Sequence, residues 1–188
     1  MNNNTLEITT NTSDCAKYTG TVTVSSYIGD RLVHTETHHN KGLERLFRFI
    51  STCLQGNWYE AKFHRPCKLV LLKNAAGEDL TESTPLTQAD YWSSDYAVCN
   101  PVMYDTAAIG EVTNDASGPE SSVTYHFRIP FLSLVSGSKI RKLLLLPANT
   151  SNYATEACAY YILDEAIEVP VAGGNFTIII DWTLTFKN

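Results

Sequence analysis

The stretch Phe176-Thr-Ile-Ile-Ile-Asp-Trp-Thr-Leu-Thr-Phe186 decides the fold class of this chain. Large apolar residues occupy every second position, and three threonines, one aspartate and one isoleucine fill the positions between them. Because side chains alternate between the two faces of a strand, this period of two predicts a strand with one buried face. Six large apolar groups on one face require a deep core, to which burial of each contributes about 1.5–3 kcal/mol.

Similar alternation, or a short apolar run, recurs along the rest of the chain, with turn residues such as Gly29-Asp30 and Ala172–Asn175 in between. Short strands at this spacing are typical of an antiparallel sandwich. We therefore predict a mainly β protein with a jelly-roll-like antiparallel β-sandwich. The expected strands cover residues 18–28, 31–37, 67–72, 96–104, 107–113, 123–129, 140–146, 157–163, 166–171 and 176–186, and a short one covers 6–10.

One segment has a helical period instead. Five apolar residues between Leu43 and Leu54 fall at i, i+3, i+4, i+7 and i+11, which places them on one face of a helix. Asn40 fits the N-cap and Gly56 fits the residue after the last turn. The sequence thus predicts one amphipathic α-helix near residues 42–55, with an apolar face that covers a sheet or an open end of the sandwich.

The chain of 188 residues is long enough for one domain. Residues 1–16 are polar and rich in Asn and Thr, so we expect an N-terminal arm there and a single β-sandwich domain over 17–188. Residues 74–95 form a long polar segment, and loops of this length in a compact domain are usually functional.

Charge is distributed unevenly, although the formal net charge is only −6. Residues 74–127 contain nine acids and no Lys or Arg, whereas residues 31–73 contain eight bases and three acids. This pattern fits either two solvated faces or a head-to-tail contact in which unlike patches of two copies meet. A net acidic chain without a basic stripe argues against nucleic-acid binding.

Membrane insertion and export are both disfavoured by the sequence. No stretch approaches the roughly 20 apolar residues of a membrane span, and the N-terminus lacks the basic and apolar parts of a signal peptide. We therefore expect folding in a cytoplasm. In that compartment the five separated cysteines are expected to be free, mostly buried thiols, namely Cys15, Cys53, Cys67, Cys99 and Cys158.

No pattern of catalytic, cofactor-binding or metal-binding residues stands out, so we expect none of these sites and no enzymatic activity. On a strand, His34 and His38 share a face about 13 Å apart, too far to hold one ion, and His39 points to the other face. Ser136-Gly-Ser-Lys139 matches the Ser-x-x-Lys pattern of penicillin-recognising enzymes, but Gly137 and a following strand oppose the helix that this chemistry needs.

Three aromatic doublets, Trp58-Tyr59, Tyr91-Trp92 and Tyr160-Tyr161, leave alternatives open. Core and rim packing explains them most simply. Exposed rings would instead suit a protein interface or a carbohydrate-binding module of a fibre or decoration protein. A third alternative is a hydrolase whose histidine, nucleophile and carboxylate converge only in the folded chain.

Four segments in order resemble small virion structural proteins of tailed bacteriophages, crAss-like phages in particular. They are Asn40–Gly56 after a hairpin, Arg65-Pro66 with the strand 68–72, Val123–Pro130, and Ile178–Leu184. The resemblance implies a β-sandwich that assembles as a ring or hub in the neck or tail. Its partners would be other copies of itself and other tail, neck or capsid proteins of the virion, assembled in the host cytoplasm. The resemblance brings no catalytic residues.

Overall fold

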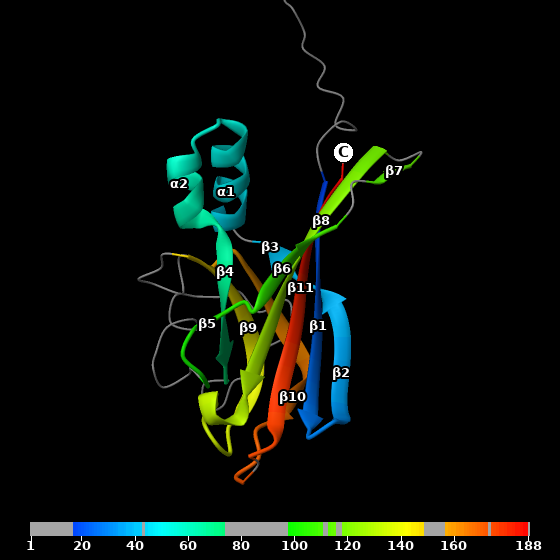
Figure 1. Ribbon diagram of the computed structural model, residues 1–188, viewed down its shortest axis with the longest axis vertical. Helices are drawn as coiled ribbons and strands as arrows, with labels where there is room; N and C mark the ends of the chain where they lie inside the picture. The colour runs from blue at the N-terminus through cyan, green and yellow to red at the C-terminus, as the bar shows by residue number, and fades with distance from the viewer. Residues whose placement is uncertain are drawn as a thin grey trace, which may run out of the picture.

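Two antiparallel sheets pack face to face in the computed structural model, which describes residues 17–42, 44–73, 98–110, 113–115, 118–148, 157–172 and 174–187 (Figure 1). Sheet A has the strand order β2-β1-β11-β8-β6, and β7 also pairs with β8. Its strands are β1 (Lys17–Ile28), β2 (Arg31–His39), β6 (Thr106–Ile109), β7 (Thr113–Asp115), β8 (Gly118–Pro130) and β11 (Phe176–Lys187). The predicted mainly β sandwich is confirmed.

Sheet B has the strand order β3-β10-β9-β4-β5. Its strands are β3 (Lys41–Gly42), β4 (Pro66–Leu72), β5 (Val102–Met103), β9 (Lys139–Pro147) and β10 (Ala159–Glu168). Pairing is nested along the chain, since β1 pairs with β11, β3 with β10 and β4 with β9. This nesting gives the sandwich its jelly-roll-like character, although β9 and β10 remain neighbours in one sheet.

The core lies between the sheets and is built largely by β11. Its five fully inward side chains are buried and its sixth, Phe186, packs against the same cluster. Val22 and Val24 of β1 lie opposite Trp182 and Ile180 in the register of the two strands. Alternation in β11 therefore produced the buried face that the sequence predicts.

The predicted helix is α1 (Glu44–Leu54), which leaves sheet B after β3 and packs its buried Leu46 into the core. Gly56 has a φ of 70°, and its N–H donates to Cys53 O at 3.0 Å, so it ends α1 as predicted. Asn40 is not the N-cap, because α1 begins at Glu44; instead the Asn40 N–H donates to Gly20 O and extends the β1–β2 pairing.

A second helix, α2 (Trp58–His64), was not predicted. Seven residues are too few to show a helical period, so the segment has no clear pattern in the sequence. One signal was present, since Asn57 follows Gly56 and precedes Glu60 by three residues, which is the spacing of an N-cap and its N3 acid. The Ala61 N–H accordingly donates to Asn57 O at 3.0 Å.

Three strand predictions need correction. Residues 166–171 are not a separate strand, because β10 continues to Glu168 through a register shift between Ile162 and Ile167. The strands expected over 96–104 and 107–113 are shorter, namely β5 and β6, and Pro101 lacks the N–H that a longer β5 would need. The arm at 1–16, its strand at 6–10 and the segment 74–95 lie outside the described residues.

Candidate interaction surfaces

Three connections lie together at one end of the sandwich, opposite α1 and α2 (Figure 1). They join β1 to β2, β8 to β9 through the short 3-10 helix η2 (Phe131–Ser133), and β10 to β11. Large apolar side chains project from all three, with Leu132 92% and Val171 82% exposed. We call this set the turn-end surface; it consists of Ile28, Leu32, Val33, Leu132, Val135 and Val171.

Hydrogen bonds tie the three connections to one another. The Gly29 N–H donates to Asn175 O at 2.9 Å, which joins the β1–β2 turn to the β10–β11 turn. Ser136 Oγ donates to Val171 O at 2.8 Å, and the Gly137 N–H donates to Val169 O at 3.0 Å. Gly29 and Gly137 have φ values of 62° and 71°, which other residues adopt only with strain. The exposed apolar groups therefore sit on a preorganised frame.

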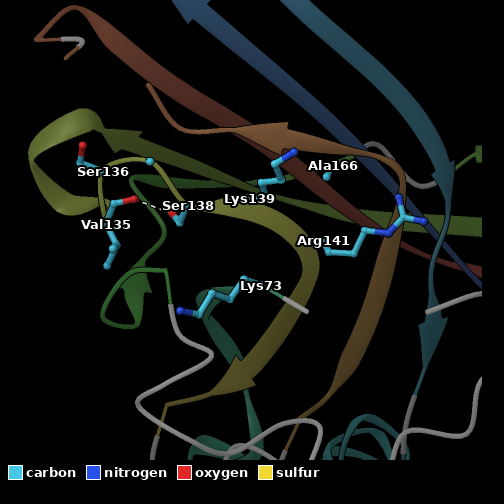
Figure 2. Close-up of a pocket in the computed structure, with 8 residues that line it drawn as sticks. Lys73, Val135, Ser136, Ser138, Lys139, Arg141 and Ala166 are labelled. Atoms are coloured by element: carbon cyan, nitrogen blue, oxygen red, sulfur yellow. Dashed lines mark hydrogen bonds between the residues drawn. The ribbon is translucent and has the colours of Figure 1, made fainter. Parts of the chain in front are cut away.

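A pocket of about 600 Å³ adjoins this surface (Figure 2). Val135 belongs to both, and the lining also includes Lys73 after β4, Lys139 and Arg141 of β9, and Ala166 of β10. Ser136 and Lys139 of the Ser-x-x-Lys pattern both line it. Ser136 lies in the turn and Lys139 in β9, so the helix that the chemistry of this pattern needs does not form.

The cations of this pocket do not converge on one point. Lys73, Lys139 and Arg141 point in different directions (Figure 2). Lys139 Nζ lies 2.7 Å from Glu168 Oε1, and this hydrogen-bonded ion pair lowers the pKa of the Glu168 carboxyl. Arg141 Nη1 donates to Asp164 O at 2.5 Å. Of these cations only Lys139 is paired with a carboxylate of the described residues, because the partner of Arg141 is a neutral backbone carbonyl, so the lining of the pocket keeps a positive charge.

The opposite end of the molecule carries a second exposed apolar set, at the connection between α1 and α2. Leu54 ends α1, and Trp58 and Tyr59 begin α2. Trp58 is 70% exposed, and Tyr59 has Lys62 Nζ 4.3 Å from its ring centroid. Both helices are anchored to sheet B at their other ends, so this hairpin tip, consisting of Leu54, Trp58 and Tyr59, is the part of the helices farthest from the sheets (Figure 1).

His38 and Glu36 of β2 join the two sheets. His38 Nε2 lies 3.1 Å from Asp164 Oδ2, and its ring stacks on Tyr161 of β10. Glu36 accepts a 3.0 Å hydrogen bond from the Tyr161 hydroxyl. His34 Nε2 lies 3.3 Å from Glu36 Oε2 but without the alignment of a hydrogen bond. His34 and His38 share a face and His39 lies on the other one, as predicted; the first two are half-buried, and His38 is within hydrogen-bonding distance of an acid of the other sheet.

Sequence reasoning missed a histidine–carboxylate pair on the outer face of sheet A. His126 Nδ1 lies 2.6 Å from Asp181 Oδ1, because β8 and β11 place these residues directly opposite each other. A carboxylate in this position orients an imidazole, as general bases require. The pair lies on a strand face rather than in the pocket, and in the described part of the chain no hydroxyl or thiol is hydrogen-bonded to His126.

The four cysteines in the described part of the chain are thiols outside any disulfide, as predicted. Cys67, Cys99 and Cys158 are buried, whereas Cys53 near the end of α1 is partly exposed. Burial raises the pKa of the Cys99 thiol to about 11, so this group is protonated and unreactive at neutral pH. Cys15 lies outside the described residues.

Within the described ranges, no three histidine, cysteine, aspartate or glutamate side chains come together as a metal site. No helix in the part of the chain that the structure describes has the length and apolarity needed to cross a bilayer. Comparisons of the chain with protein-family models, with curated proteins and with solved structures give no match.

Proposed function

We propose that this protein is a non-enzymatic structural component of a tailed-phage virion, a ring or hub protein of the neck or tail. It acts by contact with other copies of itself and with other neck, tail or capsid proteins, and it assembles in the host cytoplasm without binding nucleic acid or membrane. The resemblance of residues 40–56, 123–130 and 178–184 to such proteins supports the virion assignment. The turn-end surface supports the mode of action.

The turn-end surface is the observation that carries this proposal. Folding drives large apolar groups inside, so a group of them left half or almost fully exposed at one end of the molecule is costly unless a partner covers it. Isolated exposed side chains need no explanation, but these six lie in, or within three residues of, three connections that hydrogen bonds hold together. Exposed apolar groups on a rigid frame are typical of protein interfaces.

The strand edges are poorer candidates for contact between copies. Edge strands β3 and β5 of sheet B have two residues each, and β6 has four. The nine-residue edge strand β2 is interrupted by a register shift against β1 between Ser26 and Tyr27. Short edges, bulges and inward charges such as Glu36 are the features that block edge-to-edge pairing, so the ends of the sandwich are better candidates.

Native mass measurement of the purified protein and of virions tests the proposal. We expect a multimer at micromolar concentration and the chain present in particles. Leu132→Asp combined with Val171→Asp should shift the multimer towards monomer. Ile109→Asp is the matched control, since Ile109 of β6 is 81% exposed but lies outside the turn-end surface. A strictly monomeric wild-type protein that is absent from particles would contradict the proposal.

A carbohydrate-binding module is the second candidate, favoured by the exposure of Trp58. Stacking on a sugar needs an open ring face, and Trp58 offers one. It belongs to the hairpin tip, however, and no aromatic residue lines the described pocket. Loss of glycan binding in Trp58→Ala, measured on a glycan array, would support this candidate; no binding by the wild-type protein would exclude it. Trp92, the other candidate ring, lies outside the described residues.

A further inference from the structure

The turn-end surface and the start of β1 lie at opposite ends of the sandwich (Figure 1). Residues 1–16 precede β1, so this N-terminal arm joins the sandwich at the end away from the turn-end surface. We propose that the arm of one copy docks on the turn-end surface of the next copy, with Leu6 and Ile8 as its apolar anchors. This inference rests on the proposed function, because it names what covers the turn-end surface.

The arm has the apolar side chains that this surface needs. The turn-end surface is made of aliphatic groups only, namely isoleucine, leucine and valine. Leu6 and Ile8 are the only aliphatic residues of these three types within 1–16, and one residue separates them. In an extended segment they share one face, so both can be covered by the same apolar surface. Contact then removes aliphatic groups of both copies from water.

Charge also favours this contact. Residues 1–16 contain Glu7, which lies between the two anchors, and Asp14, but no Lys or Arg. Among the described residues, the lining of the adjoining pocket includes three cations and no carboxylate, and only Lys139 is paired with an acid. The positive lining therefore attracts an acidic segment, whereas a chain with a net charge of −6 repels such a segment on average.

Reach distinguishes docking on the next copy from docking on the same copy. The strand β1 has 12 residues and, at about 3.3 Å per residue, is roughly 36 Å long. Ile8 precedes Lys17 by nine residues, which span at most about 32 Å when fully extended. The two anchors therefore cannot both reach the far end of their own β1, where the turn-end surface lies. In head-to-tail order, the turn-end surface of the next copy lies at the end where the arm joins the sandwich.

Contact between an arm and a turn-end surface is heterologous, so it does not end at a dimer. Each copy that gives its arm still offers a turn-end surface to another copy, and the series forms a ring when the rotation closes and a filament when it does not. Hydrogen bonds of Gly29, Ser136 and Gly137 already fix the turn-end surface, so it needs no rearrangement to receive the arm.

A mixing experiment with two full-length variants tests the docking. Leu6→Asp with Ile8→Asp removes the anchors and keeps the turn-end surface, whereas Leu132→Asp with Val171→Asp does the reverse. We expect each variant alone to be monomeric by native mass spectrometry. An equimolar mixture should give one heterodimer, formed by the intact arm of one variant and the intact turn-end surface of the other, with no larger species.

A matched control isolates the role of the anchors. Asn2→Asp with Asn4→Asp adds the same charge to the arm as the anchor variant does, but it keeps both apolar side chains. It should assemble as the wild type does. Each variant is checked for an unchanged far-UV circular dichroism spectrum, and serine replaces aspartate at the same positions where that check fails.

A synthetic peptide of residues 1–16, measured by fluorescence anisotropy, gives a second readout. It should bind the anchor variant, whose turn-end surface is free, and bind the Leu132 and Val171 variant at least about tenfold more weakly. Adding Lys73→Glu and Arg141→Glu to the anchor variant should weaken binding about 3–10-fold and reduce its salt dependence. Adding Lys62→Glu and Arg65→Glu instead makes the same change in charge at exposed residues of the helical end, and should alter binding by less than about twofold.

Two sets of results would contradict the docking. A multimeric wild type overturns it but leaves the proposed function standing if the anchor variant assembles normally, if the mixture gives no heterodimer, or if the peptide binds both variants equally. A monomeric wild type also overturns the docking, and if the chain is absent from particles as well, it overturns the proposed function.

Discussion

The outer faces of the two sheets differ in kind. On sheet A the outer face is polar, with hydroxyl pairs such as Thr23–Thr37 at 2.9 Å and Thr124–Thr183 at 2.8 Å across neighbouring strands. On sheet B the row Val70, Leu144 and Tyr160 is buried, although these residues alternate with members of the central core.

This difference between the sheets is visible in the sequence pattern of their strands. A strand with one wet face alternates, as β11 does, whereas a strand buried on both faces is a continuous apolar run. Leu143-Leu-Leu-Leu146 of β9 and Leu69-Val-Leu-Leu72 of β4 are such runs. A side chain that points away from the central core should therefore contribute more to the free energy of unfolding in sheet B than in sheet A.

The largest expected effect comes from matched substitutions on the two outer faces. Leu144→Ala should lower the free energy of unfolding by about 2–5 kcal/mol, because it removes buried apolar volume from sheet B. Thr23→Ala should lower it by less than about 1 kcal/mol, because its hydroxyl pair on sheet A is exposed. Urea denaturation followed by tryptophan fluorescence measures both. Equal losses in the two variants would show that the two outer faces are not different in the way described.

A smaller effect is expected where the two sheets are joined. Tyr161→Phe removes the hydroxyl that donates to Glu36, whose side chain is only 9% exposed, and leaves a buried carboxylate oxygen without this partner. The loss should be about 1–3 kcal/mol. Tyr27→Phe, on the partly exposed outer side of sheet A, is the control and should be nearly neutral. A neutral Tyr161→Phe would argue that this contact adds nothing to the packing of the sheets.

The smallest effect concerns thiol chemistry beside sheet B. Cys67 lies in β4, the Cys158 N–H donates to Leu145 O, and Cys99 follows Val98, whose N–H donates to Leu71 O. The raised pKa of Cys99, about 11, keeps its thiol neutral in the folded chain. Unfolded thiols ionise near pH 8.5, so this group favours the folded state below that pH, and its contribution is lost as the pH rises towards 11.

Site-resolved alkylation at pH 8, read by mass spectrometry, checks this. Among the cysteines that the structure describes, Cys53 should be labelled first, and Cys67, Cys99 and Cys158 only on unfolding. Unfolding temperature should also fall between pH 9 and 11. Labelling of Cys99 as fast as that of Cys53 in the folded protein would contradict its burial.

Local patterns in the sequence were enough to predict several strands and one helix. β11, α1, β4 and β9 each have a period or an apolar run that one segment carries by itself. The features that long-range pairing creates could not be predicted in this way. His126 and Asp181 are 55 residues apart and meet only through the register of β8 and β11. The joining of His38 to Asp164 depends likewise on which strands face each other at the open side of the sandwich.

The turn-end surface could not be predicted from the sequence for a related reason. Leu132, Val135 and Val171 look like scattered apolar residues in turns, and only the hydrogen bonds of Ser136 and Gly137 bring them together. The hairpin tip needed α2, which was too short to predict. Charge segregation between residues 31–73 and 74–127 stays a prediction, because most of the acidic segment lies outside the described residues.

The position of β11 between β1 and β8 has a consequence for biosynthesis. It is translated after every other strand of the sandwich, so while the ribosome is still making it, β1 and β8 each present an unpaired edge and an uncovered apolar face. Sheet A is completed only when β11 is made and pairs with both β1 and β8, which begin at Lys17 and Gly118, about a hundred residues apart in the chain. A nascent chain stalled before Phe176 should therefore be held by chaperones or degraded, and released full-length chains alone should become competent for assembly.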